Sequence, residues 1–272
     1  MPIGNLVRSK GSRVQRSDGT ILSFPPDAVF APKSPGDADI DLEESPTVQR
    51  FSIGTKLEDV WGRAFRYVEF GGTIAQASMV QGEAPDAVHD DLDLDTAAVA
   101  GDTALVVASP ASGTADFIAD EYAQGWVFSE LLVSGIAYPI AAHLLWDISA
   151  SVALTVDLFV PVRTAIAANC DLSFVKSKYR EVIISAVAPT ASLIGANAAN
   201  GAVDGDFGWV QSVGPAKVLT AGTVVIGDGV IGITTAGAVA PAANTDAQEV
   251  KLGQVMNVGP TTEWSLIDLH LE

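Results

Sequence analysis

Short runs of alternating hydrophobic and polar residues dominate the chain after residue 50, and this period of two predicts β-strands. A strand is also predicted at 64–70, which is aromatic and β-branched and stops at Gly71-Gly72. Other strands are predicted at 126–128, 131–133, 152–160, 174–184, 218–219, 223–226, 230–234, 250–258 and 265–271. Helical periodicity is confined to a turn or two at 115–122. We therefore predict an all-β fold of β-sandwich or small β-barrel domains.

The first 50 residues follow neither the strand period nor the helix period. They hold six of the 14 prolines of the chain. Proline fixes φ and lacks an N–H donor, so such a segment is not expected inside a sheet. We predict that residues 1–50 form an extended N-terminal arm that precedes the β domains.

Two short sequence motifs each occur twice, which suggests a diverged duplication. Gly125-Trp126-Val127 recurs as Gly208-Trp209-Val210, and the run 156–160 recurs in similar form at 267–271. A duplication would place a boundary near Arg163. The predicted division is therefore an arm at 1–50, an acidic β domain at 51–162 and a second β domain at 163–272.

Composition narrows the function classes. The chain has 272 residues, 48% of them hydrophobic, which is enough for a core without disulfides or metals. Its 33 acidic residues outnumber its 15 basic ones, for a net charge of −18. This balance argues against direct nucleic-acid binding, which favours a basic surface, and the hydrophobicity argues against disorder.

The charges are distributed unevenly along the chain. Residues 67–162 contain 14 acids and no Lys or Arg, which is typical of a solvated face and would also point away from other polyanions. A predicted basic strand face follows, with Lys176, Lys178 and Arg180 at alternating positions. The first 16 residues carry no acid and four cations, which we predict to contact an acidic partner: Arg8, Lys10, Arg13 and Arg16.

Few residues have spacings that indicate catalysis. His89, His143 and His270 are too far apart in sequence for a typical zinc motif, and the single Cys170 is expected to be a small buried hydrophobe. No phosphate-binding glycine loop or nucleophile elbow occurs. We expect no enzymatic activity and no cofactor. A glycoside hydrolase, the competing hypothesis, would need two carboxyl groups in an aromatic cleft.

The acidic run at 90–95 allows two interpretations. Asp91, Asp93 and Asp95 begin like a calcium loop, but Thr96 stands at the sixth position, where glycine makes the turn, and Asp102 stands at the twelfth. The alternative is a solvated edge with the intervening leucines facing inward. Calcium binding stays open at this point.

Neither a secretory signal nor a membrane span is expected. The N-terminus lacks an apolar signal core, and the longest apolar stretch, 131–156, is interrupted by Pro139, His143 and Asp147. We therefore expect a soluble protein that is assembled in a reducing cytoplasm.

Two segments carry a resemblance to virion proteins. "RYVEFGGTIAQASMV" at 66–80 resembles the opening of structural proteins of tailed bacteriophages. "GWVQSVGPAKVLTAGTVVIGDGVIGITT" at 208–235, followed by "AGAV" at 236–239, resembles the β-rich body of capsid decoration (cement) proteins. The resemblance implies a protein that binds the outside of the major capsid lattice, commonly as a trimer at threefold sites.

These observations lead to one functional hypothesis and one alternative. The chain is predicted to be a homotrimeric cement protein on the capsid surface, with the major capsid protein and itself as partners and no direct nucleic-acid or membrane contact. Its capsid contacts would be Arg8, Lys10, Arg13 and Arg16. The alternative is a tail, fibre or receptor-binding module with the same β-rich fold.

Overall fold

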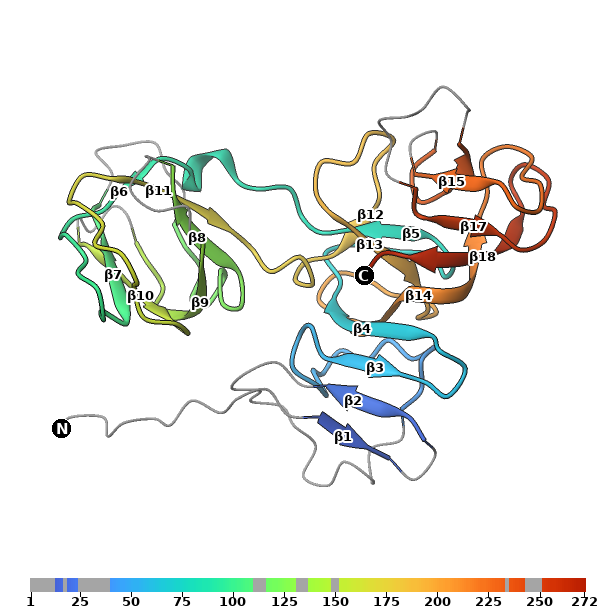
Figure 1. Ribbon diagram of the computed structural model, residues 1–272, viewed down its shortest axis with the longest axis horizontal. Helices are drawn as coiled ribbons and strands as arrows, with labels where there is room; N and C mark the ends of the chain where they lie inside the picture. Colours follow the sequence, from blue (N-terminus) through green and yellow to red (C-terminus); the bar gives the residue numbers. More distant parts are fainter. Residues whose placement is uncertain are drawn as a thin grey trace. The chain divides into compact units, whose positions relative to one another are not determined.

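The computed structural model describes residues 13–16, 19–23, 40–109, 116–130, 137–147, 152–232, 235–242 and 251–272. In these ranges the regular secondary structure consists of β-strands that pair antiparallel and one three-residue 3-10 helix at Ala87–His89. The predicted all-β class is confirmed. The chain divides into two compact units: unit 1 comprises Met1–Glu83 and Lys178–Glu272, and unit 2, Ala84–Ser177, is inserted between them (Figure 1).

Unit 1 is built on one long antiparallel sheet in the order β1-β2-β3-β4-β14-β18-β17-β15-β16, with β5 joined through β13 to β14 and also paired with β12. Its strands are β1 (Arg13–Gln15), β2 (Ile21–Ser23), β3 (Lys56–Glu58), β4 (Ala64–Glu69), β5 (Met79–Gln81), β12 (Ile183–Ile184), β13 (Leu193–Asn197), β14 (Phe207–Leu219), β15 (Gly229–Ile231), β16 (Ala240–Pro241), β17 (Gly253–Val255) and β18 (Trp264–His270).

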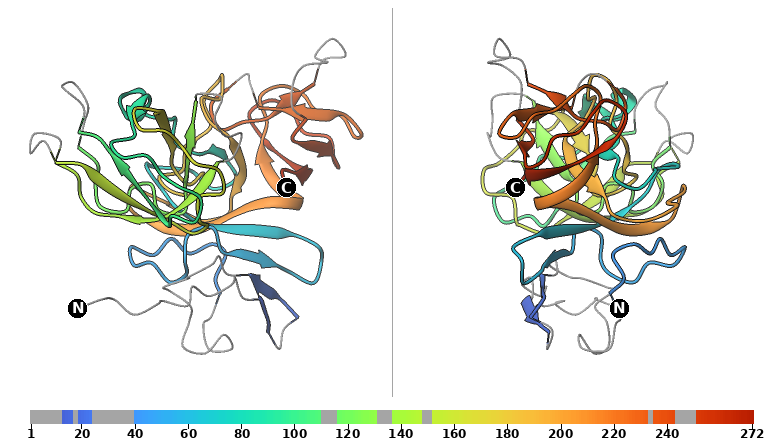
Figure 2. Two further views of the ribbon diagram at one scale, coloured as in Figure 1. Left: turned by 60° about the vertical axis from the view of Figure 1, so that its left-hand side comes forward. Right: turned by 90° about the vertical axis from the view of Figure 1, so that its right-hand side faces the viewer.

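The longest strand, β14, bends in its middle and joins two halves of unit 1 (Figure 2). It pairs with β4 as far as Val213 and with β18 from Val213 onward, and its register shifts between Gln211 and Val213. Gln211 Nε2 donates to the carbonyls of Val213 and Pro215 at 3.1 and 2.9 Å. Because the pairing of β14 with β4 ends at Val213, Pro215 is tolerated in β14 although it lacks the N–H donor that a sheet interior needs.

An aromatic cluster fills the core beside β4 and β14. The Tyr67 ring lies 5.2 Å from Phe51 and 5.1 Å from Trp209 between ring centroids. Burial raises the pKa of the Tyr67 hydroxyl, which accepts a hydrogen bond from the Arg50 amide. Leu22 of β2 is fully buried in the same cluster.

The position of Leu22 corrects the predicted arm. Residues 13–15 and 21–23 form β1 and β2 at the end of the sheet, so an arm without strands is wrong for them. The reason is local: the six prolines of 1–50 all lie outside these two short runs, which therefore keep their N–H donors.

Unit 2 is a six-stranded sheet that closes on itself. The order is β6-β11-β8-β9-β10-β7, and a bridge from Leu94 to Val107 joins the two ends, so the strands surround a common interior (Figure 1). This is a small β-barrel, and its core is one cluster that includes Phe117, Tyr122 and Phe174. The strands are β6 (Leu92–Asp93), β7 (Ala104–Val107), β8 (Trp126–Ser129), β9 (Tyr138–His143), β10 (Leu154–Leu158) and β11 (Asp171–Val175).

Several predicted boundaries differ from the structure. The predicted domain boundary at 162/163 lies inside unit 2, and the chain returns to unit 1 after Ser177. The predicted strand at 174–184 is wrong because this return interrupts it: β11 ends at Val175 and β12 begins at Ile183. The predicted strand at 223–226 is reduced to an isolated bridge from Val224 to Gly259. The prediction at 131–133 lies outside the described residues.

Candidate interaction surfaces

Two of the four predicted N-terminal cations lie within the described residues, and the other two lie outside them. Arg13 lies in β1, the edge strand of unit 1, and its Nη2 is 2.9 Å from Glu58 Oε2. Arg16 closes the β1–β2 hairpin, donating from its amide to the Thr20 carbonyl. Arg8 and Lys10 lie outside the described residues. Arg13 and Arg16 are thus brought together at one edge of the sheet, with Arg13 already paired to a carboxylate.

The predicted basic face at 174–184 does not form. Lys176 Nζ pairs with Glu121 at 2.9 Å, and Arg180 Nη1 lies 3.7 Å from Glu69. The ammonium of Lys178 lies 5.0 Å from the Tyr179 ring. Each cation is engaged within its own unit, and no single strand carries all three.

The acidic run beside β6 keeps the alternation that the sequence predicts. Leu92 and Leu94 are buried, whereas Asp91, Asp93 and Asp95 are exposed. Among the described residues, no three His, Cys, Asp or Glu side chains group to hold a metal ion. The burial pattern is the one expected of a solvated edge with inward-facing leucines.

The histidines and the cysteine of unit 2 contribute to its core. The His89 ring shares a hydrogen bond with the Tyr122 hydroxyl, and His143 Nε2 accepts one from the Tyr122 amide at 3.0 Å. Cys170 is buried 2.8 Å from the Ser129 hydroxyl, as expected of a small packed side chain. These contacts fix barrel strands to the segment at 116–125.

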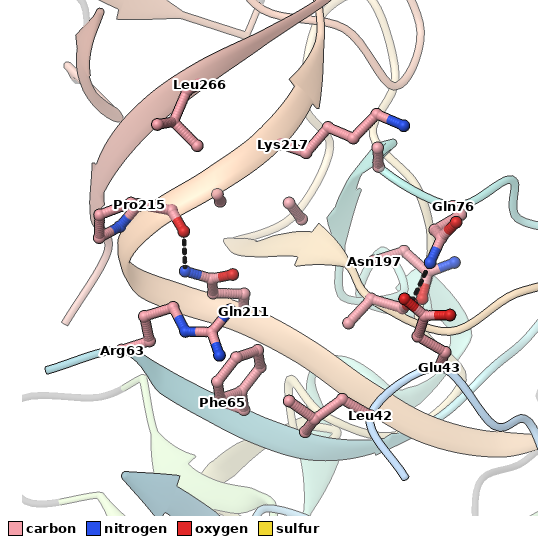
Figure 3. A pocket seen from close by; sticks show the side chains of 14 residues that line it. Leu42, Glu43, Arg63, Phe65, Gln76, Asn197, Gln211, Pro215, Lys217 and Leu266 are labelled. Atoms are coloured by element: carbon pink, nitrogen blue, oxygen red, sulfur yellow. Dashed lines mark hydrogen bonds between the residues drawn. The ribbon is translucent and has the colours of Figure 1, made fainter. Parts of the chain in front are cut away.

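The bend of β14 forms a pocket in unit 1 of about 370 Å³. Two cross-strand pairs supply its floor: Phe65 opposite Gln211, and Lys217 opposite Leu266. Figure 3 shows Arg63 beside Phe65 and Gln211 on one side and Lys217 on the other. The pocket therefore combines apolar surface with two cations and one carboxylate, Glu43.

A rigid turn between β3 and β4 presents Trp61 beside this pocket. Asp59 Oδ1 accepts the amides of Trp61 and Arg63, and Asp59 Oδ2 binds Arg63 Nε at 2.6 Å. The Trp61 side chain is 78% exposed, with the Arg63 guanidinium 5.8 Å from its ring. Gly214, at φ +83°, lets β14 pass the turn, because a Cβ there would lie 3.2 Å from the Arg63 Cα.

A second cation–tryptophan pair lies on the other wall. Lys217 Nζ is 4.4 Å from the ring of Trp264, which is 53% exposed on β18. Leu266 lies two residues further on the same exposed face. Lys217 has no acidic partner among the described residues. Arg63, Lys217 and Leu266 line the pocket, whereas Trp61 and Trp264 do not line it and each lie beside one of its cations. We call these five residues the tryptophan groove.

Sequence reasoning missed this groove. Trp61 and Trp264 are 203 positions apart in sequence, and pairing of β4 and β18 with the same strand brings their pocket-lining neighbours together. One local signal was present: Trp61 stands in the polar turn Asp59–Arg63, where a large aromatic side chain has no core to enter.

The Glu272 side chain fastens the end of β18 to β4. Its carboxylate binds Arg66 Nε at 2.6 Å and Lys56 Nζ at 2.9 Å, and it accepts a hydrogen bond from Ser212. Burial alone would raise the pKa of Glu272, but the hydrogen bonds from Arg66 and Lys56 outweigh it and lower the pKa from 4.5 to about 2. This ion cluster holds β3, β4 and the C-terminal strand together.

Comparison with known proteins assigns no relative. The chain matches no protein-family model, and no curated protein or solved structure is significantly similar to it. Within the described ranges there is no helix of the length and apolar character that spanning a membrane requires. The surfaces themselves therefore carry the functional argument.

Proposed function

We propose that this chain is a structural virion protein that binds the outside of the major capsid lattice of a tailed phage and stabilises it, as a homotrimer. The observation that carries the proposal is the placement of the N-terminal cations. Arg13 and Arg16 lie in and beside β1, an edge strand, and Arg8 and Lys10 precede it. A basic segment that leads into an open sheet edge is suited to binding an acidic neighbour.

The charge of the rest of the chain agrees with attachment through a basic segment. Unit 2 carries 13 acidic side chains against Arg163 and Lys176 alone. Acidic bodies at high local density repel one another and stay soluble, while the basic segment attaches. On this proposal the protein has no enzymatic activity or cofactor, contacts neither nucleic acid nor membrane directly, and joins the capsid surface in the host cytoplasm.

The test begins with purified particles. Cryo-electron microscopy and quantitative mass spectrometry are expected to find hundreds of copies at threefold positions of the capsid. Absence from the particles contradicts the proposal. A few dozen copies at the tail would instead support a tail, fibre or receptor-binding module.

A charge-reversal variant tests the basic segment directly. Replacing Arg8, Lys10, Arg13 and Arg16 by Glu should weaken binding to capsids lacking the protein by about a hundredfold or more, because cations and their partners interact across the interface. Lys251→Glu, at an exposed site of unit 1, is the matched control and should bind normally. Equal binding of the reversed variant and the control would rule out this segment as the anchor.

A further inference from the structure

Unit 1 contains the same strand arrangement twice, and the two arrangements share β14. In the first motif β4 pairs with the start of β14, and β5 pairs with β13. In the second motif the end of β14 pairs with β18, and β15 pairs with β17. Residues 64–70 of the first motif correspond to residues 214–220 of the second. Corresponding amides donate to corresponding carbonyls: Phe70 to Asp206 and Thr220 to Glu263, Ile74 to Ala202 and Val224 to Gly259.

The aromatic face of the first motif is covered by the chain that leads into β3. Phe65, Tyr67 and Trp209 are only 1–2% exposed. Phe51 and Leu57 lie in the same buried cluster. In the first motif an extended segment therefore shields this face from water.

The corresponding face of the second motif has no such cover among the described residues. Leu266 pairs with Lys217 across the strands, as Trp209 pairs with Tyr67 in the first motif. Leu266 is 40% exposed, and Trp264 on the same face is 53% exposed. Two apolar side chains thus meet water at positions that the first motif packs into its aromatic cluster.

The second motif also leaves a backbone edge open. In the first motif Tyr67 donates its amide to Thr55, in the segment before β3. Its counterpart is Lys217, whose N–H and C=O point to the same edge as those of Leu219, because alternate residues of a strand face the same edge. Leu219 bonds away from β18 at that edge, donating to Ala77. Among the described strands, β18 alone pairs with β14 beyond Val213, and it lies on the opposite edge.

The pocket at the bend of β14 lies along this open edge. Pro215, Ala216 and Lys217 all line its volume of about 370 Å³. The Pro215 carbonyl accepts a hydrogen bond from the Gln211 side chain there, as Figure 3 shows. Space beside a strand and an open backbone edge are what an added strand requires.

Lys217 determines the charge that suits an added strand at this edge. Its ammonium lies 4.4 Å from the Trp264 ring, and no acidic side chain among the described residues forms an ion pair with it. The pocket as a whole is not cationic, because Glu43 also lines it and Arg63 is paired with Asp59. The preference for an acidic residue therefore applies to the one position beside Lys217.

We propose that this edge and face of the second motif bind an extended segment of another protein, which adds to β14 as an antiparallel strand. The first motif shows the kind of occupant, because β3 covers the corresponding edge of β4. The segment has an apolar residue opposite Pro215, as Leu57 lies opposite Phe65, and an acidic residue beside Lys217. This inference goes beyond the capsid assignment and does not depend on it.

A synthetic peptide with the sequence of residues 51–59, FSIGTKLED, is the probe for the full-length protein. In hydrogen exchange without peptide, the Lys217 amide should exchange rapidly and the Tyr67 amide slowly. Saturating peptide should slow exchange at Lys217 at least about tenfold and leave Tyr67 unchanged. A peptide with Thr55→Glu should bind about threefold more tightly, because its carboxylate lies beside the Lys217 ammonium.

Two substitutions at one position separate the backbone from the side chain. Lys217→Pro removes the N–H at the open edge without removing a hydrogen bond to β18, and should weaken peptide binding about tenfold or more. Lys217→Ala keeps the N–H and is the matched control. It should bind FSIGTKLED as wild type does and lose the preference for the Thr55→Glu peptide. Thermal unfolding checks that both variants fold. Trp264→Ser with Leu266→Ser removes the apolar face instead, and should also weaken binding about tenfold.

Several results would overturn the inference. A Lys217 amide already protected in the monomer would mean that the chain covers this edge itself. Protection that appears only as the protein self-associates would assign the edge to a second copy of the chain. Peptide binding that is absent at millimolar concentration, or equal in Lys217→Pro and Lys217→Ala, would also overturn it. None of these results changes the number of copies on particles, so the capsid assignment stands or falls separately.

Discussion

The sheet of unit 2 closes on itself, whereas the described sheet of unit 1 ends in edge strands. In unit 2 the Leu94–Val107 bridge joins the first and last strands, and a single core cluster fills the barrel. In unit 1 the sheet ends at β1 and β16, and its core is divided among separate clusters along a bent ladder. A closed sheet offers few backbone groups to a neighbour, whereas an open sheet offers an edge and, at the bend of β14, a pocket.

The two units also differ in surface chemistry. Unit 2 presents acidic side chains around a closed barrel, with Leu144 and Leu145 exposed after β9. Unit 1 contains the cations at its edge and the two exposed tryptophans beside its bend. Among the described residues, the cationic and aromatic surfaces therefore lie on the open sheet, whereas the closed barrel offers an acidic surface.

The largest expected effect comes from breaking the barrel core. Phe117→Ala should lower the free energy of unfolding of unit 2 by about 3–5 kcal/mol, because the buried ring leaves a cavity. Hydrogen exchange should lose protection in β8–β11 while β14 of unit 1 stays protected. Ile118→Ala, at the exposed neighbouring position, is the control. Equal loss of protection in both units would contradict an effect confined to the barrel. The Phe117 ring contacts His89, Tyr122, His143, Trp146 and Phe174.

A smaller loss is expected at the bend of β14. Gln211→Leu leaves the carbonyls of Val213 and Pro215 without their donor, which should cost about 1–3 kcal/mol in chemical denaturation. Gln254→Leu removes one exposed hydrogen bond and should change stability by less than about 0.5 kcal/mol. If the two variants were equally stable, Gln211 would not be what holds the bend.

The Glu272 cluster predicts a pH-dependent contribution. Since folding lowers the pKa from 4.5 to about 2, the stabilisation is complete above pH 4.5 and is lost as the pH falls towards 2. Glu272→Gln should therefore lower the free energy of unfolding at neutral pH by about 1–2 kcal/mol. The gap to wild type should narrow between pH 4.5 and 2. The exposed Glu263→Gln serves as control; a gap that is constant with pH would refute the ion cluster.

The smallest effect on stability is expected at the exposed turn. Trp61→Ala should change the free energy of unfolding by no more than about 0.5 kcal/mol, because the side chain is mostly in water. The buried Trp209→Ala should cost about 3–5 kcal/mol. A loss for Trp61→Ala as large as that for Trp209→Ala would contradict the exposed position of the Trp61 ring.

The strand alternation was predictable where one face of a strand is buried. The runs at 92–94 and 265–271 alternate between buried and more exposed side chains as their patterns predict, whereas β4 at 64–69 is a strand with most of its side chains buried. The chain topology was not predictable. The sequences around Trp126 and Trp209 are alike, yet the first ring is exposed and the second is buried, because a local pattern does not show which segments pack over a side chain. The inserted unit and the β14 bend depend on long-range pairing, which short runs of residues do not encode.

The candidate interaction surfaces were predictable only in part, because they too depend on long-range pairing. The N-terminal cations stood out by charge alone, although half of them lie outside the described residues and Arg13 is paired to Glu58. The groove depends on residues from β4, β14 and β18, which only the fold brings to one pocket. A sequence pattern could therefore indicate an interaction protein but not the surface that it uses.

The number of copies on purified particles tests the central claim most directly. A cryo-electron microscopy reconstruction of intact particles should contain this fold on the outer capsid surface at threefold positions, in hundreds of copies, with the β1 edge of unit 1 facing the lattice. A reconstruction with every outer capsid density assigned to other proteins, and no copy of this chain in the same particles, would contradict the account.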